Sequence, residues 1–534
     1  MEYFNSFSSN YDEIGEILVE NDISIVNDKI IKNNRCITSD IVCIKNDEVV
    51  NIQKRSNILI SGILQLNSNQ KYGFNKRNVP YFKFKSISNK FPDFIVPTKN
   101  KSKKNLYCVI KLNKWEITNK HPIGQIEYLI GPIGEYENEI SILLYHTNLY
   151  PKKNKIKYIN LEENTNFDYE TFSIDPANCV DIDDALHFKT TDKYIEIGIH
   201  IANVSRYIDE LNTNYYSTIY LKNKQINMLD DKYTYNKFSL GNGKLSKALS
   251  LIIHYDLKSL SIIDYYFKET VVKNKALTYK DIDNIIKNKK KSDILELYNF
   301  TIKSKKIKSL LSTKLVEHYM VLYNSLFAET LYKYDKNTVL RTHKLNKIDT
   351  SNFDEKLSKH IKIINQNAAN YCIDPTETKH EDLDLGLYTH ATSPIRRYID
   401  IINHKNMINF LEKKQINSTN NIDLINKFQK NLRKFYNYNK KLEIIFNFPK
   451  KSVYEAFIIN INNIKVRIYI PELDIEHSFN IISHKLIEIK NVNFNLDSIE
   501  VENRIFKIYD KINIKLTPFP YENIFNKKLN VNII

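Results

Sequence analysis

Four aspartates lie within ten residues in the segment FSIDPANCVDIDDALHF: Asp175, Asp181, Asp183 and Asp184. No Lys or Arg separates them, so their charges would repel one another unless a hard cation neutralises them. In an extended segment Asp181 and Asp183 share one face, and a turn is needed to bring Asp184 to the same ion. Oxygen-only ligands favour Mg²⁺ or Mn²⁺, which usually serve phosphate chemistry when carboxylates hold them. The alternative is a merely acidic turn; a calcium loop is disfavoured because Leu186 stands where such a loop needs Gly.

A second segment, YTHATSPIRRYIDIINH, combines two arginines with a helix-start pattern. Ser393 precedes Pro394, and apolar spacing predicts a helix over Pro394–Phe410 with Arg396 and Arg397 in its first turn. Backbone N–H groups, the helix dipole and two guanidiniums would then form a phosphate site. The alternative is a capped helix whose arginines pair with surface acids.

The elements that must position these groups change along the chain. The first 150 residues contain short β-rich runs with polar turns, typical of small barrels: Ile14–Glu20, Asp40–Ile44, Ile58–Leu66 and Leu106–Leu112. A polar linker is expected over Pro151–Asn166, followed by a strand over Tyr194–Ile201 and a helix over Leu315–Leu331. From about Phe448 the alternating pattern of strands returns. The pattern predicts β-barrels, a large α/β body, and another β-barrel.

Composition limits the class of protein. The chain has 534 residues, which suggests three or four domains. Lys and Arg number 78 against 62 Asp and Glu, a net charge of +16 that favours a nucleic acid partner, although a basic surface kept for solubility is the alternative. Five scattered cysteines without CxxC spacing argue against zinc or a disulfide framework. Without an apolar run long enough for a membrane, we expect a cytoplasmic protein, with the nucleus as the alternative.

Together the two segments resemble the ribonuclease II/ribonuclease R (RNB) family. IDPANCVDIDDA is similar to its four-aspartate signature and YTHATSPIRRYIDIINH to its arginine signature; GIHIANVSRYI, LVEHYMVLYN and LRTHKL add support between them. Upstream, NNRCITSDIV and the stretch Trp115–Leu144 resemble the two cold-shock-like barrels of the exosome-type eukaryotic branch. The tail from Phe448 is only weakly similar to the family's C-terminal RNA-binding domain.

The resemblance implies an α+β multidomain fold. We expect two cold-shock-like OB barrels over residues 1–60 and 61–155, the α/β RNB catalytic domain over 156–445, and an OB-like RNA-binding domain over 446–534. An N-terminal endonuclease domain, which some members carry, is not expected.

The resemblance also implies residue roles. Asp175, Asp181, Asp183 and Asp184 would hold Mg²⁺ (or Mn²⁺), with Asp183 most needed for cleavage. Arg396 would contact the scissile phosphate and act with Asp183 in catalysis. For RNA binding it implies Tyr220, stacking on the terminal base, Tyr279 and Glu317 at the ribose, and Arg397, which more readily supports the backbone or helix. Ordinary packing of Tyr220 and an ordinary surface position of Glu317 are the alternatives.

Some positions depart from the family pattern. Asn203 replaces an aspartate, which would lower metal affinity, Ser246 and Lys247 stand near a missing Asp-Arg pair, and His318 replaces an acid. The function implied is a Mg²⁺-dependent, processive 3′-to-5′ exoribonuclease that hydrolyses single-stranded RNA to nucleoside 5′-monophosphates, as a monomer or within an RNA-decay complex. The alternatives are a weak or inactive RNA-binding member of the same fold and a nuclease for single-stranded DNA.

Overall fold

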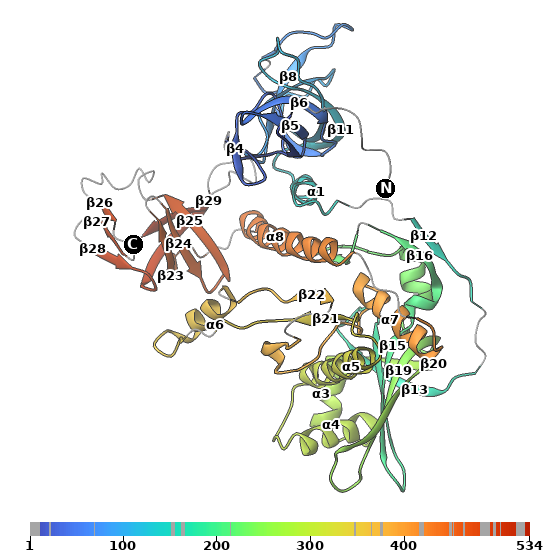
Figure 1. Ribbon diagram of the computed structural model, residues 1–534. Helices are drawn as coiled ribbons and strands as arrows, with labels where there is room; N and C mark the ends of the chain where they lie inside the picture. The colour runs from blue at the N-terminus through green and yellow to red at the C-terminus, as the bar shows by residue number, and fades with distance from the viewer. Residues whose placement is uncertain are drawn as a thin grey trace. The chain divides into compact units, whose positions relative to one another are not determined.

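The computed structural model divides the chain into two compact units. One unit comprises Met1–Tyr150, Ser351–Lys359 and Asn431–Ile534; the other comprises Pro151–Thr350 and His360–Lys430. The structure describes residues 11–20, 23–68, 70–150, 155–161, 166–213, 215–346, 349–364, 366–373, 378–415, 421–447, 451, 453–462, 465–480, 492–494, 498–501, 504–518 and 529–533. Figure 1 shows the order of the elements along the chain.

The first unit begins with two three-stranded sheets, ordered β1-β5-β6 and β2-β3-β4. Exposed and buried side chains alternate in β2 and in the first positions of β3, whereas β5 buries three consecutive residues, Val42, Cys43 and Ile44. Ile17, Val42 and Ile44 belong to the resulting core and are almost fully buried. The strands are β1 (Glu13–Glu16), β2 (Leu18–Glu20), β3 (Ile23–Val26), β4 (Lys29–Ile31), β5 (Ile41–Lys45) and β6 (Glu48–Lys54).

A closed five-stranded barrel follows in the same unit, with strands in the order β10-β11-β9-β8-β7. Gly62 lets β7 approach β8 closely, because a Cβ at this position would lie 2.2 Å from the Phe84 ring and 2.5 Å from the Lys85 carbonyl oxygen. The elements are β7 (Ile60–Leu64), β8 (Tyr81–Ser86), β9 (Phe94–Pro97), β10 (Leu106–Lys114), β11 (Ile123–Pro132) and α1 (Tyr136–His146).

The C-terminal part of this unit contains a five-stranded sheet, β25-β24-β23-β29-β30, with a core that includes Tyr454, Ile468 and Ile514. A second, three-stranded sheet has the order β26-β27-β28. The strands are β23 (Val453–Asn462), β24 (Lys465–Ile470), β25 (Ile475–Asn480), β26 (Val492–Phe494), β27 (Ser498–Val501), β28 (Arg504–Lys507), β29 (Lys511–Pro518) and β30 (Leu529–Ile533).

The second unit is built on a closed barrel, β13-β14-β15-β19-β20, in which β13 and β20 pair in parallel. Helices α3, α4 and α5 contact β20, β14 and β15 respectively, so one apolar face of the barrel packs against helices (Figure 1). Ile197, Ile199 and Leu251 on the strands and Tyr319 and Phe327 on α5 belong to this core. The elements are β13 (Tyr169–Asp175), β14 (Asp184–Thr190), β15 (Ile195–Ala202), β19 (Leu245–Tyr255), β20 (Ile262–Thr278), α3 (Tyr279–Lys287), α4 (Asp293–Ser304) and α5 (Ser312–Tyr334).

Smaller elements complete the chain. They are β12 (Lys155–Tyr158), η1 (Val204–Tyr207), β16 (Ile208–Asn212), β17 (Ile219–Tyr220), β18 (Gln225–Ile226), α2 (Asp231–Tyr233), η2 (Thr234–Phe238), β21 (Val339–Thr342), α6 (Glu355–Ile364), β22 (Asn370–Ile373), η3 (Glu381–Leu383), α7 (Tyr398–Leu411) and α8 (Ile422–Phe446). Among the described residues, no helix is both long enough and apolar enough to cross a membrane.

The α+β fold with OB-type barrels is confirmed, and the helix expected over Leu315–Leu331 lies inside the longer α5. The expected linker Pro151–Asn166 contains β12, and residues 151–154 and 162–165 of it lie outside the described residues. The helix predicted to begin at Pro394 begins instead at Tyr398, so the prediction of its start was wrong. The reason is that Arg397 is extended, with φ −131° and ψ 125°, and forms a β-bridge with Ser217. The domain boundaries stay predictions.

Candidate active site

The loop that carries the four aspartates is fixed at both ends by barrel strands. Asp175 is the last residue of β13 and Asp184 is the first residue of β14. Between them, the Ile182 N–H donates to the Ser239 hydroxyl at 3.0 Å, and the Leu240 N–H donates to the Ile182 carbonyl at 3.0 Å. The backbone of this loop is therefore held by its neighbours, which leaves the carboxylates available for other contacts.

The carboxylates crowd one another in a partly buried position. Burial, followed by the charge of Asp175, raises the pKa of Asp184 to about 7. Burial also raises the pKa of Asp175, and one of its oxygens, Oδ2, is buried without a hydrogen-bond partner. Burial raises the pKa of Asp183 well above its usual value, although the nearby Arg396 charge and the Ile395 N–H oppose this shift. The crowded carboxylates therefore favour binding either protons or a cation.

The donor set fits a hard divalent cation. The aspartates offer carboxylate oxygens, the ligands that hard cations prefer. A bound cation would contact the unpartnered Asp175 Oδ2 and would counter the effects that raise the pKa of Asp184. Cys179 adds no soft charge, because burial and then Asp175 and Asp181 raise the pKa of its thiol to about 12. No three His, Cys, Asp or Glu side chains in the described part of the chain are already grouped to hold a metal. The role of Asp175, Asp181, Asp183 and Asp184 as its ligands stays a prediction.

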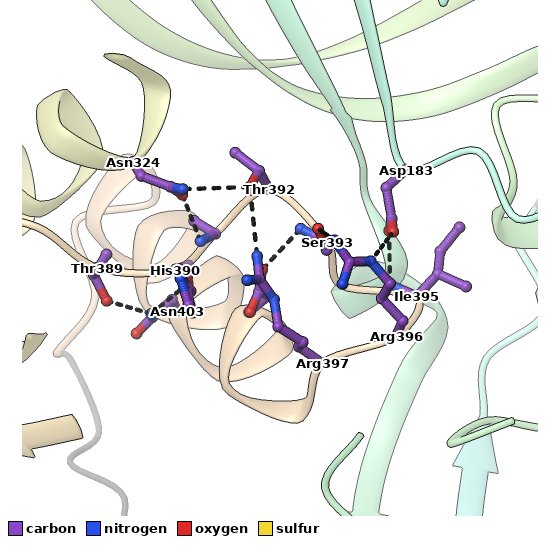
Figure 2. A network of polar contacts seen from close by, with 12 residues as sticks. Asp183, Asn324, Thr389, His390, Thr392, Ser393, Ile395, Arg396, Arg397 and Asn403 are labelled. Carbon is purple, nitrogen blue, oxygen red and sulfur yellow. Dashed lines mark hydrogen bonds and ion pairs between the residues drawn. The ribbon is translucent and has the colours of Figure 1, made fainter. Parts of the chain in front are cut away.

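Arg396 lies beside Asp183, although the two residues are far apart in the sequence. The Ile395 N–H, 212 residues from Asp183, donates to Asp183 Oδ1 at 2.9 Å, and Arg396 Nε lies 3.6 Å from Oδ2 (Figure 2). Arg396 Nη2 donates to the Ser393 hydroxyl at 2.9 Å, and 43% of the side chain is exposed. A buried carboxylate therefore meets a guanidinium that remains accessible to a ligand.

A short backbone pairing sets the position of Arg396. Its carbonyl accepts hydrogen bonds from the Thr218 N–H at 3.0 Å and from the Ser217 hydroxyl at 3.1 Å. The Tyr398 N–H donates to the Tyr216 carbonyl at 3.1 Å on the same bridge. This pairing ties the arginine segment to the chain that leads into β17, where Tyr220 lies.

Arg397 points into the protein rather than toward Asp183. It pairs with Asp400 at 2.8 Å and is 15% exposed, while Asp400 also accepts the Ser393 N–H at 2.7 Å. Figure 2 shows Arg397 near Thr392, to whose hydroxyl it donates at 3.4 Å. This geometry favours a supporting role over direct RNA contact, for which Arg397 stays a prediction.

Two tyrosines predicted from the sequence lie at the aspartate cluster. The Tyr220 hydroxyl donates to Asp181 Oδ2 at 2.8 Å, and 40% of the residue is exposed. Tyr279 begins α3 behind the Thr278 cap, and burial followed by the charges of Asp184 and Asp175 raises its pKa. Sequence reasoning placed Tyr220 as a stacking ring but missed its hydroxyl contact with Asp181.

Two other positions have contacts directed elsewhere. Glu317 lies on α5, is 54% exposed and pairs with Lys314 at 2.6 Å. The buried Asn203 donates to Glu269 Oε1 at 2.7 Å, and Glu269 in turn pairs with Arg206 at 2.5 Å. Neither Glu317 nor Asn203 has a described contact with the aspartates, so their effects on ribose recognition and metal affinity stay predictions.

Comparison with known proteins gives matches over both units. The RNB domain model matches residues 165–310 and 293–413, and the model of the Dis3-like cold-shock domain 2 matches residues 81–148. The mouse exosome complex exonuclease RRP44 is 23% identical over 540 residues, covering 80% of this chain and 55% of that protein. The chain thus spans about half the length of the curated relatives it matches.

Solved structures support the fold. Ribonuclease R of Mycoplasma genitalium in complex with ribose-methylated single-stranded RNA matches with a TM-score of 0.74 at 15% identity, covering 98% of this chain and 100% of that chain. Yeast Ssd1, described as a pseudonuclease, matches with a TM-score of 0.68 at 16% identity, covering 97% of this chain and 96% of that chain. At these identities the likenesses show the fold and leave activity to the site itself.

Proposed function

Because this chain belongs to the RNB family of ribonucleases, we propose that it is a divalent-metal-dependent, processive 3′-to-5′ exoribonuclease that hydrolyses single-stranded RNA to nucleoside 5′-monophosphates. The observation that carries the proposal is the pairing of the buried Asp183 carboxylate with the exposed Arg396 guanidinium, 3.6 Å apart, beside further crowded aspartates. A cluster that binds a cation next to an accessible guanidinium is suited to a phosphodiester.

The residues divide the work as follows. Asp175, Asp181, Asp183 and Asp184 would hold Mg²⁺ or Mn²⁺, which when bound polarises the phosphoryl oxygen and lowers the pKa of a bound water. Arg396 binds the scissile phosphate and stabilises the negative charge that develops on it. Its exposed side chain can reach a ligand without unfolding the segment, since the backbone bridge to Ser217 holds the turn.

The strand end is held by aromatic and polar groups. Tyr220 stacks on the terminal base, which any base sequence permits. Tyr279, whose pKa is raised by burial and by the charges of Asp184 and Asp175, would donate to the ribose 2′-hydroxyl and so favour RNA over DNA. Glu317 would add a second ribose contact, for which its pairing with Lys314 must open.

A second candidate function is RNA binding with weak or no cleavage. The fold alone supports it equally, since a structure described as a pseudonuclease matches the chain over nearly its full length. Asn203 and Lys247, which depart from the family pattern, favour RNA binding without cleavage. The four aspartates and the Asp183–Arg396 pair favour cleavage. A nuclease for single-stranded DNA is the third reading.

One gel distinguishes these functions. A 5′-labelled RNA with a 3′ overhang is incubated with the full chain plus Mg²⁺, plus EDTA, or as Asp183→Asn, alongside a DNA of matched sequence. We expect full-length RNA to be converted to a short end product without accumulated intermediates, and only in Mg²⁺. Mass spectrometry should show nucleoside 5′-monophosphates, and Asp183→Asn should not cleave. Asp192→Asn, the same change in an exposed turn outside the cluster, should cleave like the wild type. Cleavage by Asp183→Asn at the wild-type rate contradicts the assignment, and retained RNA binding without cleavage by the wild type supports the second candidate.

The partners follow from the same proposal. The mouse relative is named as an exonuclease of the exosome complex. For this chain we propose single-stranded RNA as the ligand, action as a monomer or in an RNA-decay complex, and a place in the cytoplasm or nucleus. Co-purification of a tagged chain from its own cells, followed by size-exclusion chromatography, separates the monomer from the complex.

A further inference from the structure

A basic hollow lies in the first unit, on residues that the aspartate cluster does not use. Its walls are residues 58–61, which lead into β7, residues 86–91 at the end of β8 and after it, residues 145–148 at the end of α1 and after it, and one face of α8. The α8 face contributes Asn431, Lys434, Tyr438 and Lys441, whose spacing places them on one side of a helix. The cavity volume is about 590 Å³, which is within the range of small-ligand sites.

The charges of this hollow are unbalanced. Lys90, Lys434 and Lys441 line it, and none of its lining residues is Asp or Glu. Within the described part of the chain, none of these three lysines forms an ion pair. Burial and the charge of Lys434 lower the pKa of the neighbouring His146 to about 4, so His146 is neutral at pH 7. The three lysines line one hollow without a carboxylate in its lining. Burial lowers the pKa of Lys441, and the charge of Glu476, outside the lining, opposes this shift while that of Arg467 adds to it. An anion in the hollow would therefore be attracted by the excess positive charge.

One lining residue also offers an aromatic surface. Tyr438 is 38% exposed, and its ring centroid lies 6.2 Å from that of His146 at an interplanar angle of 78°. An exposed ring beside lysines is the combination that contacts a base and a phosphate in the same ligand. Inorganic phosphate would use only the charges, whereas a nucleotide would use the charges, the ring and more of the volume.

We propose that this hollow is a second nucleotide site, which binds a phosphate-bearing nucleotide through Lys90, Lys434 and Lys441 and its base through Tyr438. The occupant is a free nucleoside monophosphate or one nucleotide of an RNA strand, and the phosphate chemistry is shared. The inference does not rest on cleavage, because all of its residues belong to the first unit and the aspartates and Arg396 belong to the second.

The test uses the full chain carrying Asp183→Asn, in EDTA, so that RNA stays intact and no metal holds a phosphate at the aspartates. Adenosine 5′-monophosphate and inorganic phosphate are titrated by calorimetry, and a fluorescent oligoadenylate by anisotropy. We expect the monophosphate to bind, and the double change Lys434→Gln with Lys441→Gln to weaken binding at least about tenfold, since two charge-assisted contacts are lost. Lys430→Gln, the same change on α8 outside the lining, should leave binding unchanged.

The titrations with adenosine 5′-monophosphate and with oligoadenylate distinguish a free nucleotide from an RNA strand as the occupant. Direct binding of adenosine 5′-monophosphate that depends on Lys434 and Lys441 supports a free nucleotide as occupant. Binding of oligoadenylate alone, weakened by the double change but not by Lys430→Gln, supports a strand. Tyr438→Ala should weaken the nucleotide more than inorganic phosphate. If the double change and Lys430→Gln bind every probe equally while both melt like the parent chain, the proposal is overturned.

Discussion

Replacing Tyr220 by Phe separates two roles that this side chain combines. The ring, 40% exposed, can stack on a base, while the hydroxyl donates to Asp181 Oδ2 at 2.8 Å. Phe keeps the ring and removes only the hydrogen bond. A partner that orients a metal-binding carboxylate is typically worth about 10–100-fold in metal affinity. Because Tyr220 is partly exposed, we expect the low end, about tenfold or roughly 1.4 kcal/mol.

The assay measures cation and RNA dependence independently. Initial rates on labelled RNA are recorded against Mg²⁺ concentration, and RNA affinity is measured by anisotropy in EDTA. Tyr220→Phe should need about tenfold more Mg²⁺ for half-maximal rate while its RNA affinity stays within about twofold of wild type, since stacking is retained. Tyr220→Ala should also lose about 1–3 kcal/mol of RNA affinity. Tyr235→Phe removes a hydroxyl that accepts from Gln225 at 2.7 Å and should change neither quantity.

Two results would refute this reasoning. An unchanged Mg²⁺ dependence in Tyr220→Phe would show that its hydroxyl does not organise Asp181. A loss of RNA affinity in Tyr220→Phe equal to that in Tyr220→Ala would show that the ring is not the part that binds RNA.

Three further predictions concern the same site. In EDTA the folded-state pKa of Asp184, about 7, exceeds its ordinary value of 3.8, so its contribution to the free energy of unfolding should fall as pH rises from about 4 to about 7, by at most about 4 kcal/mol; Asp184→Asn should weaken the pH dependence in urea titrations at pH 5 and 8, and the raised pKa values of Asp175 and Asp183 should leave the remainder. Arg396→Ala should fold normally and lower kcat by about 10²–10³, whereas Arg397→Ala leaves Asp400 buried and unpaired and should lower the free energy of unfolding by about 3–5 kcal/mol; equal melting of the two variants contradicts this. Glu317→Gln should reduce the preference for a 3′-terminal ribose over deoxyribose in matched substrates, and an unchanged preference assigns Glu317 to the surface.

The sequence was informative where a pattern is local or matches a family motif. The aspartate segment and the arginine segment could be paired by resemblance, and the structure brings Asp183 and Arg396 together. The start of α7 was not predictable from local spacing, because a bridge to Ser217, distant in sequence, keeps Arg397 extended. The hydrogen bond from Asn203 to Glu269 was not predictable for the same reason, because strand pairing brings together residues that are distant in the sequence.

The Asp183–Arg396 ion pair can open when a phosphate binds Arg396, because other contacts hold the two side chains in place. Arg396 Nε lies 3.6 Å from the carboxylate, and 43% of the arginine side chain is exposed, so solvent screens the arginine end of the pair. Asp183 is held instead by burial and by the Ile395 N–H, and Arg396 by its bond to Ser393. When a phosphate draws the guanidinium away, Asp183 loses the positive charge that opposes the rise of its pKa. A cation at the aspartates would restore that charge, so cation and RNA should each strengthen the binding of the other by the same factor.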